Sequence, residues 1–158
     1  MKKVIIFDFW GTLADNGVRS PMRHVRSILG FEDMDYGEFV MKFENIFMTK
    51  KFDSLNEAFG LVCKEFGVEA DEVLLNRLVG VWNTNWLLAK LYPETMAVLG
   101  ELKDKYRLVL VSNTDCFSLP KVMDKYKLGG LFDIVALSFD LGLLKTDIGF
   151  YRKVLDET

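Results

Sequence analysis

The chain has 158 residues, of which 50% are hydrophobic and 13% aromatic, and its formal net charge is −3. This length and composition predict one domain with room for a small subdomain, and they exclude disorder of the whole chain. The acidic balance argues against a nucleic-acid partner, and no apolar run approaches the about 18 residues that a membrane span requires.

The N-terminal segment predicts a strand that ends in a carboxylate. Val4–Phe7 is a run of β-prone residues, Asp8 follows it, and Gly11 provides a turn. We expect this strand to be buried on both faces, as strands of parallel sheets are. Such sheets carry their chemistry at the carboxyl ends of the strands, so Asp8 is a candidate reacting group.

The segment from residue 20 to residue 91 shows only helical patterns. We expect helices over residues 20–29, 35–48, 54–66 and 71–88. Pro21 suits a first helical position, Ser54 and Glu57 fit a capping box, and Gly67 fits a helix end. Apolar stripes at helical spacing predict that these helices pack into a small bundle.

Helices and short apolar runs alternate from residue 93 onward. We expect strands over residues 108–111 and 134–137, and helices over residues 93–105, 118–126 and 149–157. This alternation predicts an α/β fold with parallel strands and right-handed crossovers. The helical bundle, inserted after the first strand, would stand above the carboxyl ends of the strands and act as a lid.

The strand ends deliver different polar groups. Asp8 follows the first strand. Ser112 and Asn113 follow the second, and Lys145 lies in the loop after the third. A carboxylate can act as a covalent nucleophile, whereas a hydroxyl and an ammonium suit the anionic oxygens of a phosphoryl group. Each residue alone is more often an ordinary turn or surface residue, but their joint order predicts phosphoryl transfer, normally assisted by Mg²⁺.

These segments resemble the first three motifs of the haloacid dehalogenase superfamily. The motifs read FDFWGTL, LVLVSNTD and GLLKTD. The stretch LYPETMAVLGELKDKYRLVLVSN also resembles that family's approach to its second motif. The helical insertion resembles the family's helical cap of the first type (C1-type), and the resemblance covers essentially the whole chain.

The resemblance implies a two-part architecture. Residues 1–14 and 92–158 would form a Rossmann-like, three-layer core with a parallel sheet, and residues 15–91 would form the helical cap. The activity it implies is hydrolysis of a small phosphorylated metabolite by a phosphatase that forms an aspartyl-phosphate.

The resemblance also implies roles for particular residues. Asp8 would be the nucleophile, and Ser112 and Lys145 would bind the transferred group. Thr12 in the first-motif loop and Asn113 are the further substrate-binding candidates.

A magnesium site is implied as well. In most members of the family Mg²⁺ is bound by the nucleophile, here Asp8, by the backbone carbonyl two residues later, here that of Trp10, and by an acidic residue of a fourth motif. Carboxylate and carbonyl oxygens are the ligands that Mg²⁺ prefers.

Trp10 departs from the family pattern. Phosphatases of this family usually carry a second aspartate at this position, which protonates the leaving group and then activates water. An indole cannot replace it, and general acid–base catalysis contributes about 10²- to 10⁴-fold, so we expect phosphatase activity to be weaker by about that factor. The structural alternative is that Trp10 only shapes the pocket floor.

The dehalogenase branch of the family offers the alternative function. It carries a tyrosine at the position of Trp10 and needs no metal, because a halide leaving group needs no proton. A metal-independent 2-haloacid dehalogenase-like hydrolase would need a halide cradle, for which Asn113 or a cap arginine among Arg19, Arg23 and Arg26 are the candidates. Arginines on an exposed helix face are usually solvated, so phosphate chemistry stays ahead.

The end of the sequence is the second departure. The family's fourth motif is another strand that ends in an acidic pair, and residues 146–158 leave no room for it. We therefore expect an incomplete sheet with an unpaired apolar edge, open to self-association. The chain reads as a fragment of a longer hydrolase, in which Mg²⁺ binds in the parent and weakly or not at all here. A non-catalytic fragment that associates through this edge is the third interpretation.

Cysteine and histidine usage completes the sequence analysis. Cys63 and Cys116 are the only cysteines, and without a signal peptide they predict a reducing cytoplasm and no disulfide. We do not expect Cys116 to be a nucleophile, because the only histidine, His24, lies in a distant helical segment and is expected on the surface. The expected partner is a small phosphorylated substrate, with neither nucleic acid nor a membrane involved.

Overall fold

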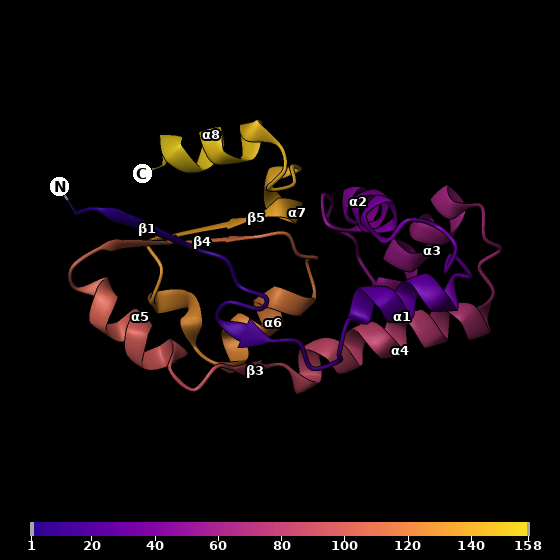
Figure 1. Ribbon diagram of the computed structural model, residues 1–158, viewed down its shortest axis with the longest axis horizontal. Helices are drawn as coiled ribbons and strands as arrows, with labels where there is room; N and C mark the ends of the chain where they lie inside the picture. Colours follow the sequence, from indigo (N-terminus) through magenta and orange to yellow (C-terminus); the bar gives the residue numbers. More distant parts are fainter. Residues whose placement is uncertain (1, 158) are drawn as a thin grey trace.

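A computed structural model describes residues 2–157 of the chain (Figure 1). The strands β1 (Val4–Phe7), β4 (Arg107–Ser112) and β5 (Ile134–Leu137) form a parallel sheet in the order β1–β4–β5. Helices α5 and α6 cover one face of this sheet and α8 covers the other, as Figure 1 shows. The predicted α/β class and three-layer arrangement are therefore confirmed.

The central strand β4 supplies both layers of the core. Leu108 and Leu110 belong to the hydrophobic cluster on the side of α5 and α6, whereas Val109 and Val111 belong to the cluster that includes Phe150 of α8. Alternate residues of a strand point to opposite faces, so a continuous apolar run can serve two layers. The near-continuous hydrophobicity of this strand is the signature of a strand buried on both faces.

The prediction that the first strand is buried on both faces is wrong. Val4 and Ile6 are 39% and 43% exposed. Among the residues that the structure describes, β1 pairs only with β4, so it lies at the edge of the sheet. The cluster around α8 reaches β4 and β5 and leaves this face of β1 uncovered. The expected unpaired apolar edge is present.

The helical bundle agrees with the sequence patterns. Its helices are α1 (Pro21–Ile28), α2 (Tyr36–Phe47), α3 (Leu55–Phe66) and α4 (Glu72–Leu88). Ser54 caps α3 by accepting a hydrogen bond from the Glu57 backbone N–H at 3.1 Å, although the Glu57 side chain returns to the N–H of Asp53 rather than to that of Ser54. Gly67 ends α3 with a φ of 70°, a left-handed conformation that glycine adopts without steric cost.

The remaining helices begin or end close to their predicted limits. They are α5 (Thr95–Lys103), α6 (Ser118–Lys125) and α8 (Ile148–Asp156). A 3-10 turn, η1 (Leu128–Gly130), follows α6 and was not predicted. The sequence analysis missed α7 (Ser138–Leu141), because one turn of helix shows no periodicity. No helix within residues 2–157 is long and apolar enough to cross a bilayer.

A short antiparallel ribbon, also missed, joins the bundle to the α/β region. Its strands are β2 (Ala14–Asp15) and β3 (Lys90–Leu91). Beside it, the backbone N–H of Gly17 donates to the carbonyl of Asn85 at 3.1 Å. A Cβ atom at Gly17 would lie only 2.3 Å from that carbonyl oxygen, so this approach requires glycine.

We propose that this ribbon marks the boundary of the cap at residues 15–91. The bundle has a hydrophobic cluster centred on Phe43, Phe47, Phe59 and Trp82, whose rings are largely or fully buried, and Leu144 of the α/β region also packs in it. The core at residues 1–14 and 92–158 has separate clusters on the two faces of its sheet. The two parts therefore have largely distinct cores, which the Trp82–Asp115 and Asn113–Glu44 hydrogen bonds join.

Candidate active site

A cavity of about 350 Å³ lies where the carboxyl ends of the strands meet the helical bundle. Side chains from the strand ends and from the helices line it together; they include Asp8, Trp10, Ser112, Asn113 and Lys145 from the first group and Tyr36, Glu44 and Trp82 from the second. The sheet and the bundle therefore share one site, and its volume suits a small ligand.

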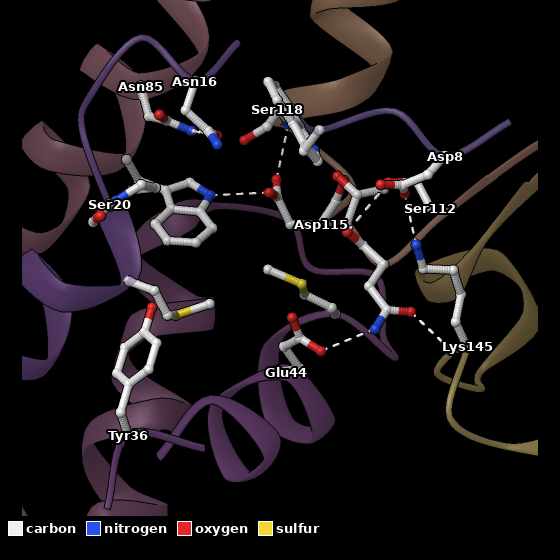
Figure 2. A pocket seen from close by; sticks show the side chains of 17 residues that line it. Asp8, Asn16, Ser20, Tyr36, Glu44, Asn85, Ser112, Asp115, Ser118 and Lys145 are labelled. Atoms are coloured by element: carbon white, nitrogen blue, oxygen red, sulfur yellow. Dashed lines mark hydrogen bonds and ion pairs between the residues drawn. The ribbon is translucent and has the colours of Figure 1, made fainter. Parts of the chain in front are cut away.

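Asp8 and Lys145 form an ion pair in this cavity (Figure 2). Lys145 Nζ lies 2.6 Å from Asp8 Oδ1, and the two side chains are 25% and 38% exposed, respectively. Asp8 follows β1, whereas Lys145 lies in the loop after α7. The fold thus brings the first and third predicted motifs into direct contact.

Ser112 and Thr12 flank the ion pair in different ways. Ser112 is fully buried at the end of β4, lines the cavity, and donates its hydroxyl to the Asn113 carbonyl at 3.3 Å. Thr12 is exposed, with its Oγ1 atom 3.5 Å from Asp8 Oδ2, and is not among the side chains that line the cavity. The structure therefore places Thr12 beside the carboxylate and outside the cavity wall.

Asn113 connects the helical bundle to the α/β region. Its Nδ2 atom donates to Glu44 Oε2 at 2.9 Å, and its Oδ1 atom accepts from the Lys145 backbone N–H at 2.8 Å. Both ends of the amide are already bonded. In this arrangement Asn113 positions the loop of Lys145 and the side chain of Glu44.

Trp10 lines the cavity, and none of the described residues donates a hydrogen bond to its backbone carbonyl. The indole packs edge-on against Phe9 with ring centroids 5.0 Å apart. The tight loop is held by the Phe9 carbonyl, which accepts from the N–H groups of Thr12, Leu13 and Ala14. No hydrogen bond from residues 2–157 reaches the Trp10 carbonyl oxygen.

The Asp8 carboxylate and the Trp10 backbone carbonyl are the candidate oxygens for a magnesium site. The described residues contain no group of three or more histidine, cysteine, aspartate or glutamate side chains able to hold a metal ion. Mg²⁺ commonly takes one or two protein ligands and completes its octahedron with waters and substrate phosphate oxygens. The Asp8 carboxylate and the free Trp10 carbonyl suit that mode of binding.

Asp115 is a buried site residue to which the sequence analysis assigned no role beyond its place at the end of the LVLVSNTD motif. It is 2% exposed, and its carboxylate accepts from the Trp82 indole at 2.9 Å and from the backbone N–H groups of Phe117 and Ser118 at 2.8 Å each. It therefore begins α6 and fixes the Trp82 ring at the same time. The link to Trp82 spans 33 residues, so no local pattern signals it.

Glu44 is the second functional residue that the sequence analysis missed. It projects from α2 into the cavity, where burial raises its pKa above the ordinary value, against the opposing effects of the Asn113 hydrogen bond and the Lys145 charge. The available signal was its position next to Phe43, within the apolar stripe of the helix. A carboxylate beside such a stripe lies near the edge of the buried face.

The structure does not support Cys116 as a nucleophile. The Cys116 sulfur contacts the Phe52 carbonyl at 3.8 Å, and burial raises the pKa of its thiol, which disfavours the reactive thiolate. His24 is exposed, as expected.

None of the three cap arginines that were candidates for a halide cradle lines the cavity. The Arg26 guanidinium donates to the backbone carbonyls of Phe31, Glu32 and Met34. Arg19 and Arg23 are exposed, and neither lines the cavity.

Comparison with known proteins gives a consistent result. The chain matches the family model for haloacid dehalogenase-like hydrolases over residues 2–158. A haloacid dehalogenase family enzyme from Bacteroides thetaiotaomicron, solved with magnesium and inorganic phosphate, is 16% identical and aligns with a TM-score of 0.65 over 99% of this chain and 79% of that one. A predicted hydrolase of this family from Porphyromonas gingivalis is 20% identical, with a TM-score of 0.66 over 100% and 77% of the two chains.

A third solved structure extends the comparison. A haloacid dehalogenase-like family protein from Streptococcus pneumoniae is 20% identical, with a TM-score of 0.55 over 98% of this chain and 69% of that one. No curated protein matches the chain. At these sequence identities the solved structures show a shared fold.

Proposed function

Because the chain belongs to the haloacid dehalogenase-like hydrolases, we propose that it is a phosphatase that hydrolyses a small phosphorylated metabolite through an aspartyl-phosphate on Asp8. The observation that carries this proposal is the Asp8–Lys145 ion pair, 2.6 Å long, in a cavity that the buried Ser112 also lines. An acid, a hydroxyl and an ammonium at one point suit nucleophilic attack on a phosphoryl group.

Asp8 supplies the nucleophile of the proposed reaction. One carboxylate oxygen forms a bond to phosphorus while the bond from phosphorus to the leaving oxygen breaks. Water then attacks the same phosphorus, which releases inorganic phosphate and restores the carboxylate. The first step moves the phosphoryl group to a residue that is already held in the cavity, so water is the only further reactant of the second step.

Lys145 and Ser112 stabilise the transferred group. The Lys145 ammonium lies beside the attacking carboxylate and stays close to the equatorial phosphoryl oxygens as their charge develops. The Ser112 hydroxyl can turn from the Asn113 carbonyl, where its 3.3 Å bond is long, toward a phosphoryl oxygen. Thr12, beside Asp8, is a further donor once substrate enters.

We include Mg²⁺ in the proposed site. The Asp8 carboxylate and the Trp10 backbone carbonyl would hold it, and the ion would neutralise charge between an anionic nucleophile and an anionic substrate. The free carbonyl of Trp10 supports this assignment. The relative from Bacteroides thetaiotaomicron was solved with magnesium and inorganic phosphate.

The test compares phosphate-ester hydrolysis by the wild type and by Asp8→Asn, with and without added Mg²⁺. We expect Asp8→Asn to reduce turnover to the background rate. Asp33→Asn changes an exposed aspartate outside the cavity and should retain full activity. Equal turnover by the wild type and Asp8→Asn would refute the proposal.

A dehalogenase is the second candidate, favoured by the aromatic residue at position 10. A halide leaves without a proton, so this reaction would not require a general acid at position 10. Against it, Arg26 is bound to backbone carbonyls and Arg19 and Arg23 do not line the cavity. Release of halide from 2-haloacids without a metal, in the absence of phosphate-ester hydrolysis, would favour this candidate.

A third candidate is a non-catalytic role for the free edge of β1, where Val4 and Ile6 are exposed. Unpaired apolar strand edges promote association with a further strand. Tight dimerisation by a chain that is inert toward phosphate esters and haloacids would favour this role. We further propose a cytoplasmic location, which the free thiols of Cys63 and Cys116 support.

A further inference from the structure

Hydrolysis of an alkyl phosphate needs a proton donor, because an alkoxide is a poor leaving group. Trp10 lies in the loop that follows the nucleophile, two residues after Asp8, and its indole cannot donate a proton near neutral pH. The ionisable side chains that line the same cavity are Asp8, Tyr36, Glu44, Asp115 and Lys145. One of them has to supply the proton if the site acts on alkyl esters.

Three of these side chains are already committed. Asp8 and Lys145 are paired with each other, and the proposed reaction uses both. Asp115 accepts three N–H hydrogen bonds, shared between its two oxygens, from an indole and two backbone groups. These three contacts tie the Asp115 carboxylate to the Trp82 ring and to the backbone at the start of α6, so Asp115 is committed to a structural role.

Tyr36 and Glu44 remain, and their positions differ. Figure 2 shows Tyr36 at the end of the cavity away from Asp8 and Lys145, whereas Glu44 lies nearer to them, beside the Asn113 side chain. The guanidinium of Arg23 lies 4.2 Å above the Tyr36 ring, which anchors the tyrosine toward the bundle surface. Position therefore favours Glu44.

The Glu44 carboxyl is tied to the phosphoryl-binding residues by one oxygen only. Oε2 accepts from Asn113, which follows Ser112 in the chain and also holds the Lys145 backbone. No residue among 2–157 donates a hydrogen bond to Oε1. The carboxyl is thus held in one orientation with a free oxygen at the cavity wall.

We propose that Glu44 is the acid and base of the reaction and performs from the cap the role that the residue at position 10 cannot perform. This inference rests on the proposed phosphatase function. In the first step the Glu44 carboxyl gives its proton to the leaving oxygen as that oxygen separates from phosphorus. In the second step the resulting carboxylate takes a proton from water as the water oxygen attacks the phosphorus of the aspartyl-phosphate.

One group can serve both steps because of the geometry of in-line displacement. The attacking water enters on the side of phosphorus opposite Asp8, which is the side that the leaving oxygen has vacated. Burial raises the pKa of Glu44, which extends its protonated form toward neutral pH, where a general acid is most useful. Lys145 is the cation that opposes this shift.

The test uses Glu44→Gln and two phosphate esters that differ in their leaving groups. Glycerol 3-phosphate releases an alkoxide, whereas p-nitrophenyl phosphate releases a stabilised phenolate that needs no proton. We expect the variant to lose about 10²- to 10⁴-fold in kcat/KM on the alkyl ester. With p-nitrophenyl phosphate it should release one equivalent of nitrophenolate in a burst and then turn over slowly, because the base for the second step is missing.

The pH profile provides a second readout. The wild-type kcat/KM for glycerol 3-phosphate should fall as Glu44 ionises with rising pH, and this limb should be absent in Glu44→Gln. Glu38→Gln makes the same change on an exposed residue of α2 and should leave the rate and the profile unchanged.

The outcomes separate this inference from the proposed function. Loss on the alkyl ester together with a nitrophenolate burst supports a catalytic Glu44. If Glu44→Gln keeps alkyl-ester activity within about threefold while Asp8→Asn is inactive, the role of Glu44 is refuted and the phosphatase stands. Equal losses on both esters without a burst also refute it, because only positioning would be affected. If the wild type hydrolyses neither ester, the proposed function fails and this inference with it.

Discussion

Lys145 Nζ lies 2.6 Å from Asp8 Oδ1, although the two residues are 137 positions apart in the chain. Their elements do not pair directly, since β4 separates β1 from β5 in the sheet. The loop after α7 crosses the carboxyl edge of the sheet and brings the ammonium back to the first strand. The contact therefore depends on the whole α/β region being folded.

We predict that Lys145→Ala lowers kcat/KM for phosphate esters by about 10²- to 10³-fold, the range found when one group that stabilises transition-state charge is removed. Steady-state kinetics measure the effect. Lys105→Ala removes an exposed lysine far from the cavity and serves as the control. Unaltered kinetics in Lys145→Ala would show that the ion pair has no part in catalysis.

We predict that Trp10→Asp rescues Glu44→Gln. The new carboxyl would stand in the nucleophile loop and supply the proton that Glu44 no longer provides. Alkyl-ester hydrolysis should recover by about tenfold or more over the single variant, within the range of general acid catalysis. The double variant and both single variants are compared with one substrate. A double variant no faster than Glu44→Gln would argue against a shared role for the two positions.

The raised pKa of Glu44 makes a prediction about stability. A carboxyl whose pKa is higher in the folded state favours folding while protonated, and this contribution is lost as pH rises from the ordinary value of 4.5 through the folded-state value. Glu44→Gln has no ionisable carboxyl at this position, so its stability does not fall with rising pH for this reason. Denaturant unfolding should show that the variant gains stability relative to the wild type as pH rises to neutrality. A variant that becomes relatively less stable over the same range would contradict the assignment of burial as the main cause.

The aromatic cluster of the bundle gives a larger stability effect. Phe47 is fully buried, and its ring centroid lies 4.9 Å from that of Phe43, 4.8 Å from that of Phe59 and 5.0 Å from that of Trp82. Phe47→Ala should lower the free energy of unfolding by about 3–5 kcal/mol. Met41→Ala, at a position that is 60% exposed on the same helix, should change it by less than about 0.5 kcal/mol. Equal effects of the two changes would show that this cluster is not the core of the bundle.

The junction between cap and core is tested by a pair of glycine substitutions. A Cβ atom at Gly17 would lie 2.3 Å from the Asn85 carbonyl oxygen and 2.6 Å from Leu88 Cβ, so Gly17→Ala should destabilise the protein by about 1–3 kcal/mol. At Gly60, inside α3, a Cβ atom meets nothing within 4 Å, and Gly60→Ala should stabilise by about 0.5–1 kcal/mol. Thermal unfolding measures both, and a tolerated Gly17→Ala would rule out the close approach.

The elements with a long period or a marked cap could be predicted from the sequence. Helix α3 lies within one residue of its predicted limits, because Ser54 and Gly67 mark its ends and an apolar stripe runs between them. The two-residue strands β2 and β3 could not be predicted, since their pairing depends on two chain segments that meet only in the folded protein. The burial of β1 was misjudged because a run of apolar residues does not tell an edge strand from a central one.

Some residues of the candidate site could likewise be predicted from the sequence, whereas others could not. Asp8, Ser112 and Lys145 could be found because each follows a strand, and parallel strands bring their carboxyl ends to one edge. Glu44 was missed, because its position beside the apolar stripe of α2 indicates burial but does not show that the helix packs against the strand ends. Its contact with Asn113 spans 69 residues and leaves no local pattern.

The central claim is that Asp8 becomes covalently phosphorylated. The most direct measurement is to quench Glu44→Gln with acid during the burst with p-nitrophenyl phosphate and to locate the phosphoryl group by peptide mass spectrometry. We predict one phosphoryl group on Asp8, which hydroxylamine removes and which Asp8→Asn lacks. Steady turnover by the wild type with no phosphoryl group on Asp8 in the quenched protein, or with the group on another residue, would contradict the account.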